Sequence, residues 1–86
     1  MERAVGGNFS KLSVYIAEDS EVVLRLLIAL IESSGLVKVV GTSDDATAAV
    51  EEILHLMPNV VLVDLHLRVG SGLDIITTLK SVYRSS

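Results

Sequence analysis

The sequence predicts an α/β domain in which helices cover a parallel sheet, in the order strand, helix, strand, helix, strand, helix. Short apolar runs alternate with longer segments whose apolar residues recur at helical spacing. Half of the residues are apolar, and Val, Leu and Ile dominate them, which is typical of a buried parallel sheet. The run at 59–63 is apolar without alternation, which indicates a strand buried on both faces.

The first strand and helix are expected at 12–17 and at about 21–34. Ser20 is suited to cap the helix, and Glu21 lies in its first turn, where the helix dipole favours an anion. Gly35 is placed to end it. Because apolar residues cover most of the circumference of this helix, we expect other elements to cover it on more than one side.

The second strand is expected at 37–41 and the second helix at about 45–57. Three residues could cap this helix: Ser43, Asp44 and Asp45. Apolar residues recur along it at helical spacing, so it should bury one face. Pro58 then stops the helix, because the residue before a proline avoids helical angles.

The third strand, at 59–63, ends at Asp64 and is followed by a loop at 65–71. A third helix is expected to begin at Ser71 or Gly72 and to end near Tyr83. Strands that alternate with helices of this length pair in parallel through right-handed crossovers.

Composition and charge exclude several classes of function. The 86 residues suffice for one small domain, and the leader at 1–10 looks flexible, without the apolar core of a signal peptide. The formal net charge of −4 and the lack of a Lys or Arg run argue against direct contact with nucleic acid. Without cysteine there are no disulfides or thiolate metal sites. The most apolar stretch, at 22–31, is too short to span a membrane, so we expect a soluble, cytoplasmic domain.

Acidic residues follow two of the predicted strands. Glu18 and Asp19 come directly after the first strand, and Asp64 comes directly after the third. In an open parallel sheet, ligands bind beyond the carboxyl ends of the strands. If the first and third strands are neighbours, the three carboxylates converge, and a hard cation such as Mg²⁺ relieves their repulsion. The sequence therefore predicts a Mg²⁺ site beside a carboxylate, Asp64, that can accept a phosphoryl group.

A plainer interpretation stays open for each part of this pattern. Residues 18–20 also form an ordinary helix start, and an Asp at the end of a strand is a common turn residue. The segment 70–72 contains two glycines, but no Gly-Lys-Ser/Thr follows it, so it is not a phosphate-binding loop of the Walker type. His55 is expected to face solvent, and a lone loop histidine such as His66 is usually not a metal ligand.

In combination these motifs resemble the receiver domain of two-component response regulators. The resemblance covers 11–82 and includes the acidic pair 18–19, the strand before Asp64, and the runs Asp64-Leu65-His66-Leu67 and Gly72-Leu73-Asp74. It implies a flavodoxin-like, three-layer parallel sandwich with strand order 2-1-3, in which 11–86 supplies the first three βα units and lacks the last two. The segments at 39–41 and 44–46 look most like the subfamily with helix-turn-helix output domains.

The resemblance also implies a mechanism. Asp64 would accept a phosphoryl group from the phosphohistidine of a sensor histidine kinase. Mg²⁺ would be bound by Asp19 and Asp64 directly, by Glu18 through water, and by the main-chain carbonyl of His66. The acyl phosphate would then bias a two-state switch that regulates an output domain, with DNA-binding transcription control as the expected output.

Two departures from the family pattern bear on this function. Arg68 stands where the family usually has Pro, which should make the loop less rigid and add a charge near the site. The Ser/Thr after strand four and the Lys after strand five have no counterpart. Without those strands, the third strand at 59–63 is an apolar edge, so we expect a homodimer or a domain-swapped oligomer formed through it.

Two alternative functions remain. One is a non-phosphorylated pseudo-receiver that acts as a dimerisation or interaction module, favoured by Arg68 and the missing Lys. The other is an enzyme, a Mg²⁺-dependent phosphatase with an Asp nucleophile. Such enzymes usually need a second acid two residues after the nucleophile, and His66 occupies that position. We therefore expect a signalling module that is not an enzyme.

Overall fold

Six elements follow one another in the predicted order in the computed structural model, which describes residues 11–84. The predicted flexible leader at 1–10 lies outside the described residues. The elements are β1 (Leu12–Ala17), α1 (Glu21–Glu32), β2 (Val37–Ser43), α2 (Ala46–Leu56), β3 (Val60–Val63) and α3 (Gly72–Arg84).

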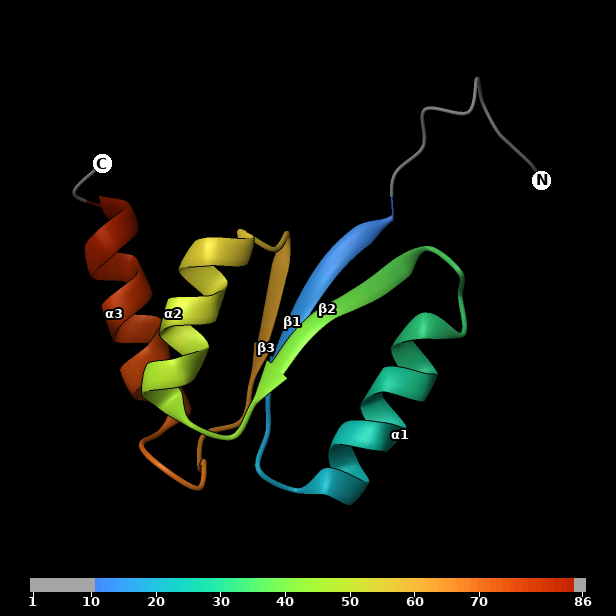
Figure 1. The fold of residues 1–86 in the computed structure, drawn as a ribbon, viewed down its shortest axis with the longest axis horizontal. Helices are drawn as coiled ribbons and strands as arrows, with labels where there is room; N and C mark the ends of the chain where they lie inside the picture. The colour runs from blue at the N-terminus through green and yellow to red at the C-terminus, as the bar shows by residue number, and fades with distance from the viewer. Residues whose placement is uncertain (1–10, 85–86) are drawn as a thin grey trace.

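The three strands form one parallel sheet in the order β2-β1-β3, as the sequence predicted. Helix α1 lies on one face of the sheet, and helices α2 and α3 lie side by side on the other (Figure 1). All three strands therefore end at the same edge, and the loops that follow β1 and β3 leave the sheet next to each other (Figure 1). This edge is where the predicted site residues lie.

The observed boundaries differ from the predicted ones by a few residues. Strand β2 continues to Ser43 because Thr42 and Ser43 pair with the end of β1. Helix α1 ends at Glu32, and the chain turns through Gly35, which has a φ of +77° and donates its N–H to the Glu32 carbonyl at 3.1 Å. Helix α2 begins after Asp45, which caps it.

The larger core fills the space between the sheet and the α2–α3 layer. Its buried side chains come from β1, α2, α3 and the β3–α3 loop: Tyr15, Ala17, Ala46, Ala49, Ile53, Leu67, Ile75 and Leu79. Val14 and Ile16 alternate with these β1 residues and are buried on the face that carries α1. Central strand β1 is thus buried on both faces, which holds the residues that follow it in a defined place.

A large side chain in β1 shapes the neighbouring strand. Tyr15 is fully buried, and its hydroxyl donates to Oε1 of Glu52 on α2 at 2.6 Å. Beside it, the pairing of β1 with β2 skips Val40, so that Tyr15 pairs with Gly41. A Cβ on Gly41 would lie 2.8 Å from Cε2 of the Tyr15 ring. Glycine therefore makes room for the ring, and the irregularity in β2 accompanies that close approach.

A side-chain clamp fixes how β3 lies against β1. The Ser13 N–H and Oγ donate to Oδ1 of Asn59 at 2.8 and 3.0 Å, and the Asn59 N–H lies 2.9 Å from the Ser13 Oγ. This clamp precedes β3, at the edge of the sheet opposite the acidic residues. A one-residue slip would turn every side chain of β3 to the other face, so the clamp helps to set which residue reaches the site.

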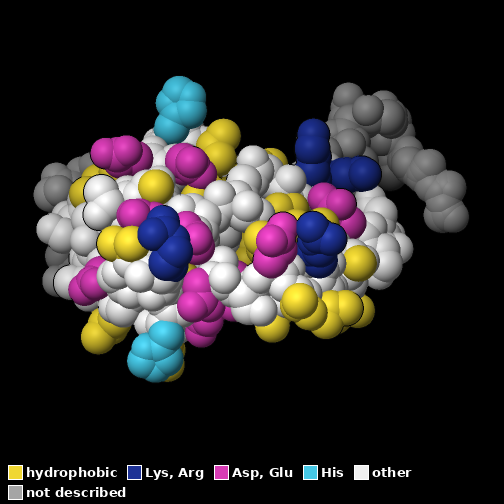
Figure 2. Space-filling model, turned by 60° about the horizontal axis from the view of Figure 1, so that its bottom comes forward, with side chains coloured by type: hydrophobic (Ala, Val, Ile, Leu, Met, Phe, Trp, Pro, Cys, Tyr) yellow, Lys and Arg dark blue, Asp and Glu magenta, His cyan; other side chains and the backbone are white. Residues whose placement is uncertain are grey.

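Helix α1 is less covered than the sequence predicted. None of its residues is fully buried, and Val22, Leu26 and Leu30 are 70%, 65% and 72% exposed. Hydrophobic side chains gather on the α1 side of the molecule in Figure 2. The prediction of cover on more than one side is wrong for residues 11–84, because only the sheet lies against this helix. Within these residues, no helix is long and apolar enough to cross a membrane.

Candidate metal and phosphoryl-acceptor site

The three predicted carboxylates converge at the carboxyl edge of the sheet. Glu18, Asp19 and Asp64 each offer an oxygen, and these oxygens lie within 4.8 Å of one another. Glu18 and Asp64 are partly buried, whereas Asp19 is exposed. The sequence separates Asp19 from Asp64 by 45 positions, and the adjacency of β1 and β3 brings them together.

Backbone hydrogen bonds carry the sheet past the strand ends and hold these acids in place. The Glu18 N–H donates to the Ser43 carbonyl at 3.0 Å, which fixes it beside β2. The Asp64 N–H donates to the Ala17 carbonyl at 2.9 Å, which fixes it beside β1. The cluster therefore rests on main-chain geometry that the sheet determines.

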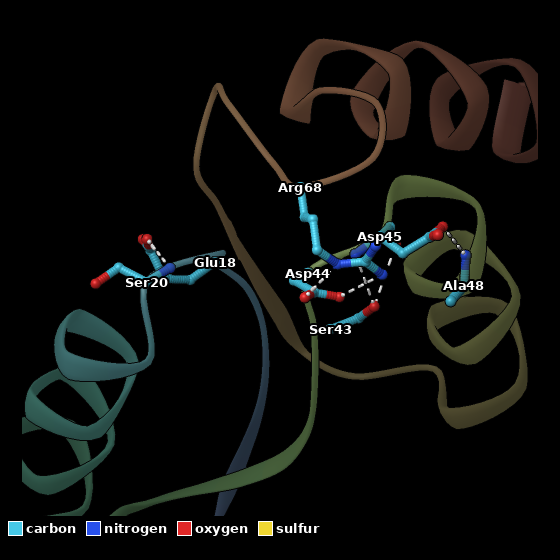
Figure 3. Close-up of polar contacts among 7 residues, drawn as sticks. All are labelled: Glu18, Ser20, Ser43, Asp44, Asp45, Ala48 and Arg68. Atoms are coloured by element: carbon cyan, nitrogen blue, oxygen red, sulfur yellow. Dashed lines mark hydrogen bonds and ion pairs between the residues drawn. The ribbon is translucent and has the colours of Figure 1, made fainter.

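The polar residues just before α1 have two different roles. Ser20 caps the helix, because its Oγ accepts the Val23 N–H at 3.3 Å. Oε2 of Glu18 accepts the Ser20 N–H at 3.1 Å, which orients the Glu18 side chain (Figure 3). The capping interpretation thus holds for Ser20, and Glu18 and Asp19 still meet Asp64. The two readings of this segment are compatible.

A shallow hollow borders the cluster on the β2 side. Asp64 is not among the residues that line it, which are Glu18, Asp19, Glu21, Leu24, Thr42, Ser43 and Asp44. Figure 2 turns this edge toward the viewer and shows acidic side chains spread across it. The carboxylates are therefore accessible from solvent, as a site that receives a phosphorylated partner requires.

The loop after Asp64 folds back on itself around His66. His66 and Ser71 form a short antiparallel bridge, whose bonds run from the Gly72 N–H to the Leu65 carbonyl at 3.0 Å and from the Leu67 N–H to the Gly70 carbonyl at 3.4 Å. These bonds use the neighbours of His66 and leave its own carbonyl outside the bridge. The His66 side chain is exposed. Its carbonyl as a metal ligand stays a prediction.

The same loop is tied to the loop between β2 and α2. Arg68 donates to both carboxylate oxygens of Asp44, with Nε–Oδ2 and Nη2–Oδ1 distances of 2.8 and 3.4 Å (Figure 3). The hydrogen bond from this guanidinium, with its charge, lowers the pKa of Asp44 below its usual range. We expected Arg68 to loosen the loop, but the structure shows it bound to a neighbouring loop instead.

Two residues matter to this site although the sequence did not single them out for it. Gly72 packs so closely that a Cβ there would lie 2.2 Å from the Asp64 carbonyl oxygen. The sequence placed Gly72 at the start of the third helix and within a receiver-like run, but not against the backbone of Asp64. Asp44 is a possible cap and part of the receiver-like segment 44–46 in the sequence, and nothing there pairs it with Arg68, 24 residues away. The cap of α2 is Asp45, whose Oδ1 accepts the Ala48 N–H at 3.1 Å (Figure 3).

Comparison with known proteins shows which family matches this chain. Residues 14–85 match the family described as the response regulator receiver domain. A protein-glutamate methylesterase/protein-glutamine glutaminase from Symbiobacterium thermophilum is 36% identical over 56 residues, which are 65% of this chain and 16% of that protein. The chain thus spans less than a fifth of this relative.

Solved structures show the same fold. The response regulator domain of Thermotoga maritima CheB aligns with a TM-score of 0.79 and 26% identity, over 84% of this chain and 54% of that one. A LuxR-family DNA-binding response regulator from Staphylococcus aureus aligns with a TM-score of 0.78 and 25% identity, over 84% and 60%. The chain spans little more than half of either structure.

Proposed function

Because this chain belongs to the response regulator receiver family of two-component systems, we propose that Asp64 accepts a phosphoryl group from a sensor histidine kinase with Mg²⁺. The observation that carries the proposal is the convergence of Glu18, Asp19 and Asp64 within 4.8 Å. Parallel strands bring these acids to the edge where α/β sheets bind ligands. The site also lies open to a macromolecular donor.

The spacing of the acids suits one small, hard cation. Mg²⁺ binds oxygen at about 2.1 Å, so two direct ligands lie no more than about 4.2 Å apart. Separations of up to 4.8 Å fit two direct carboxylates and a third that binds through water. We assign the direct contacts to Asp19 and Asp64 and the water-mediated one to Glu18. The His66 carbonyl, which the loop bridge leaves unused, would add a neutral oxygen.

The residues of this chain would then act as follows. A carboxylate oxygen of Asp64 attacks the phosphorus of a phosphohistidine, the P–N bond breaks, and an acyl phosphate forms while the imidazole leaves with the bonding electron pair. Mg²⁺ would neutralise charge on the transferred group. Ser20 and Ser43 hold Glu18 through hydrogen bonds at 3.1 and 3.0 Å, so the acid is oriented before the donor arrives.

Phosphoryl uptake tests this proposal directly. The chain is incubated with acetyl phosphate and Mg²⁺, and the product is measured by intact mass and by a phosphate-affinity gel. We expect the wild type to gain one phosphoryl group. No group should be added when EDTA is present during the reaction, or in Asp64→Asn. Glu51→Gln, which removes an exposed acid from α2, is the matched control and should be labelled normally. Uptake that persists in Asp64→Asn contradicts the assignment.

The relatives differ in the output that accompanies their receiver domain. The sequence resembles the subfamily with helix-turn-helix outputs, and the similar structure from Staphylococcus aureus is that of a DNA-binding response regulator. The curated relatives instead carry methylesterase names, and another neighbour is the CheB receiver. We propose only that this receiver controls an attached or associated output. The methylesterase activity is that of the relatives and is not proposed for this chain.

A second candidate is self-association through β3, which the sheet edge favours. Strand β3 is an outer strand of the sheet formed by residues 11–84, and Val60 and Leu62 on it are 42% and 38% exposed. An apolar edge strand pairs readily with another chain. Self-association through β3 is compatible with a pseudo-receiver that is not phosphorylated and with a receiver that is.

A further inference from the structure

The loop that carries Asp64 and His66 is joined to the β2–α2 loop by main-chain contacts. The Val69 N–H donates to the Asp44 carbonyl at 3.3 Å, and the Ala46 N–H donates to the Val69 carbonyl at 2.9 Å. Asp45 and Val69 therefore form an isolated parallel bridge. These contacts extend the side-by-side arrangement of the two loops beyond the sheet proper.

Two of the bonds that hold the β3–α3 loop are long. The Leu67–Gly70 bond measures 3.4 Å and the Val69–Asp44 bond 3.3 Å, whereas strong N–H···O bonds lie near 2.9 Å. The loop also lacks a proline to restrict it, because Arg68 stands where the resembled family usually has one. Other main-chain bonds of this loop are short, from the Gly72 N–H to the Leu65 carbonyl at 3.0 Å and from the Ala46 N–H to the Val69 carbonyl at 2.9 Å. The weakly held part of the loop is therefore the stretch from 67 to 69.

The Arg68–Asp44 pair adds a restraint at the residue between the two long bonds. Two parallel contacts between a guanidinium and a carboxylate fix both distance and orientation, which a single-point contact does not. The Arg68 and Asp44 side chains are 63% and 43% exposed, so the pair should contribute little to global stability. Its consequence is local, because Asp44 also lines the hollow beside Glu18 and Asp19. The pair thus connects the acceptor loop to the wall of the site.

We propose that Arg68 and Asp44 are positioning residues that hold the β3–α3 loop so that Asp64 and the His66 carbonyl can bind a divalent cation together with Asp19. The proposal rests on the proposed function and goes beyond it, because it gives a role to two residues outside the acidic cluster. Neither residue contacts the cation in this scheme.

The signs of the effects separate positioning from simple electrostatics. By charge alone, Arg68→Ala removes a positive charge near the site and should tighten Mg²⁺ binding, whereas Asp44→Asn removes a negative charge and should weaken it. Positioning predicts that both variants bind Mg²⁺ more weakly, by about ten-fold, the lower end of the range for groups that orient metal ligands. The double variant should be no weaker than either single one, because the two residues act through one contact.

Isothermal titration with Mg²⁺ measures these affinities, and Arg25→Ala is the matched control. Arg25 forms a more exposed ion pair with Glu21 at 3.2 Å on α1, away from the acceptor loop. This variant should bind Mg²⁺ like the wild type, and the urea unfolding midpoints of all variants should agree closely. Affinity changes of opposite sign in Arg68→Ala and Asp44→Asn, or additive changes in the double variant, overturn the proposal.

Amide hydrogen exchange without metal provides a second readout that does not depend on Mg²⁺ binding. The Ala46 and Val69 amides donate across the two loops, so both should exchange faster in Arg68→Ala and Asp44→Asn but not in Arg25→Ala. If the wild type binds no Mg²⁺ but the Ala46 and Val69 amides exchange faster in Arg68→Ala and Asp44→Asn, the loop restraint is supported and the proposed metal site fails. Unchanged exchange in both variants refutes the restraint itself.

Discussion

Replacement of Gly72 by alanine tests whether close packing at the start of α3 sets the position of Asp64. Gly72 is buried, and its N–H donates to the Leu65 carbonyl at 3.0 Å. A Cβ at this position would lie 2.2 Å from the Asp64 carbonyl oxygen and 2.5 Å from Cγ1 of Val63. One of these neighbours is backbone, so a change of rotamer cannot relieve the overlap.

The size of the effect follows from these distances. Carbon and carbonyl oxygen approach to about 3.3 Å, so α3 and β3 must separate by about 1 Å. Overpacking of a close-packed region typically costs about 1–3 kcal/mol. Alanine is a better helix former than glycine by up to about 1 kcal/mol, which offsets part of this cost. We expect a net loss of about 1–2 kcal/mol in the free energy of unfolding, which is large for a domain of this size.

Urea unfolding followed by circular dichroism measures the loss, and Gly35→Ala is the control. Gly35 has a φ of +77° and no atom within 4 Å of a built Cβ, so its replacement costs only backbone strain, about 1–2 kcal/mol. Both variants should unfold more easily, but only Gly72→Ala should also reduce phosphoryl uptake by Asp64, measured under conditions where both are folded. A Gly72→Ala protein with wild-type stability and uptake would refute the argument.

Two further predictions concern β1 and β3. Tyr15→Phe should lower stability by about 1–2 kcal/mol in urea unfolding at neutral pH, because Glu52 loses a hydrogen bond from the phenol. Burial, together with the hydrogen bond to Glu52 and its charge, raises the pKa of Tyr15, so the stability it contributes is present below about pH 10 and is lost as the pH rises toward the folded-state pKa. The wild type should therefore weaken more steeply than Tyr15→Phe above about pH 10; equal slopes contradict this. For self-association, light scattering should detect a dimer that Leu62→Lys disrupts and exposed Leu73→Lys does not, and a concentrated monomer rules the association out.

The order of the elements and the identity of the acidic cluster could be predicted from the sequence. Each depends on local information: the apolar run that ends at Asp64, the helical spacing, and the turn residues at 18–20. Adjacency of β1 and β3 came from the family resemblance, since a single chain of alternating strands and helices does not state its strand order. The boundaries shifted by a few residues because pairing, such as that of Thr42 and Ser43 with β1, extends a strand past its apolar part.

Contacts between distant side chains could not be predicted in this way. Arg68 appeared as a loosening substitution until the structure placed Asp44 beside it, and Tyr15 gave no sign that it would bond to Glu52. The exposure of α1 also differed from expectation, because its pattern reports that it is apolar but not which elements cover it.

The sequence by itself thus determined which residues end the strands, and hence that Glu18, Asp19 and Asp64 lie on one edge of a parallel sheet. Tertiary structure decided the distances among them, the hollow beside them and the tie between the two loops. The reason is physical: secondary structure depends on residues a few positions apart, whereas ion pairs and close packing depend on residues that only the folded chain brings together.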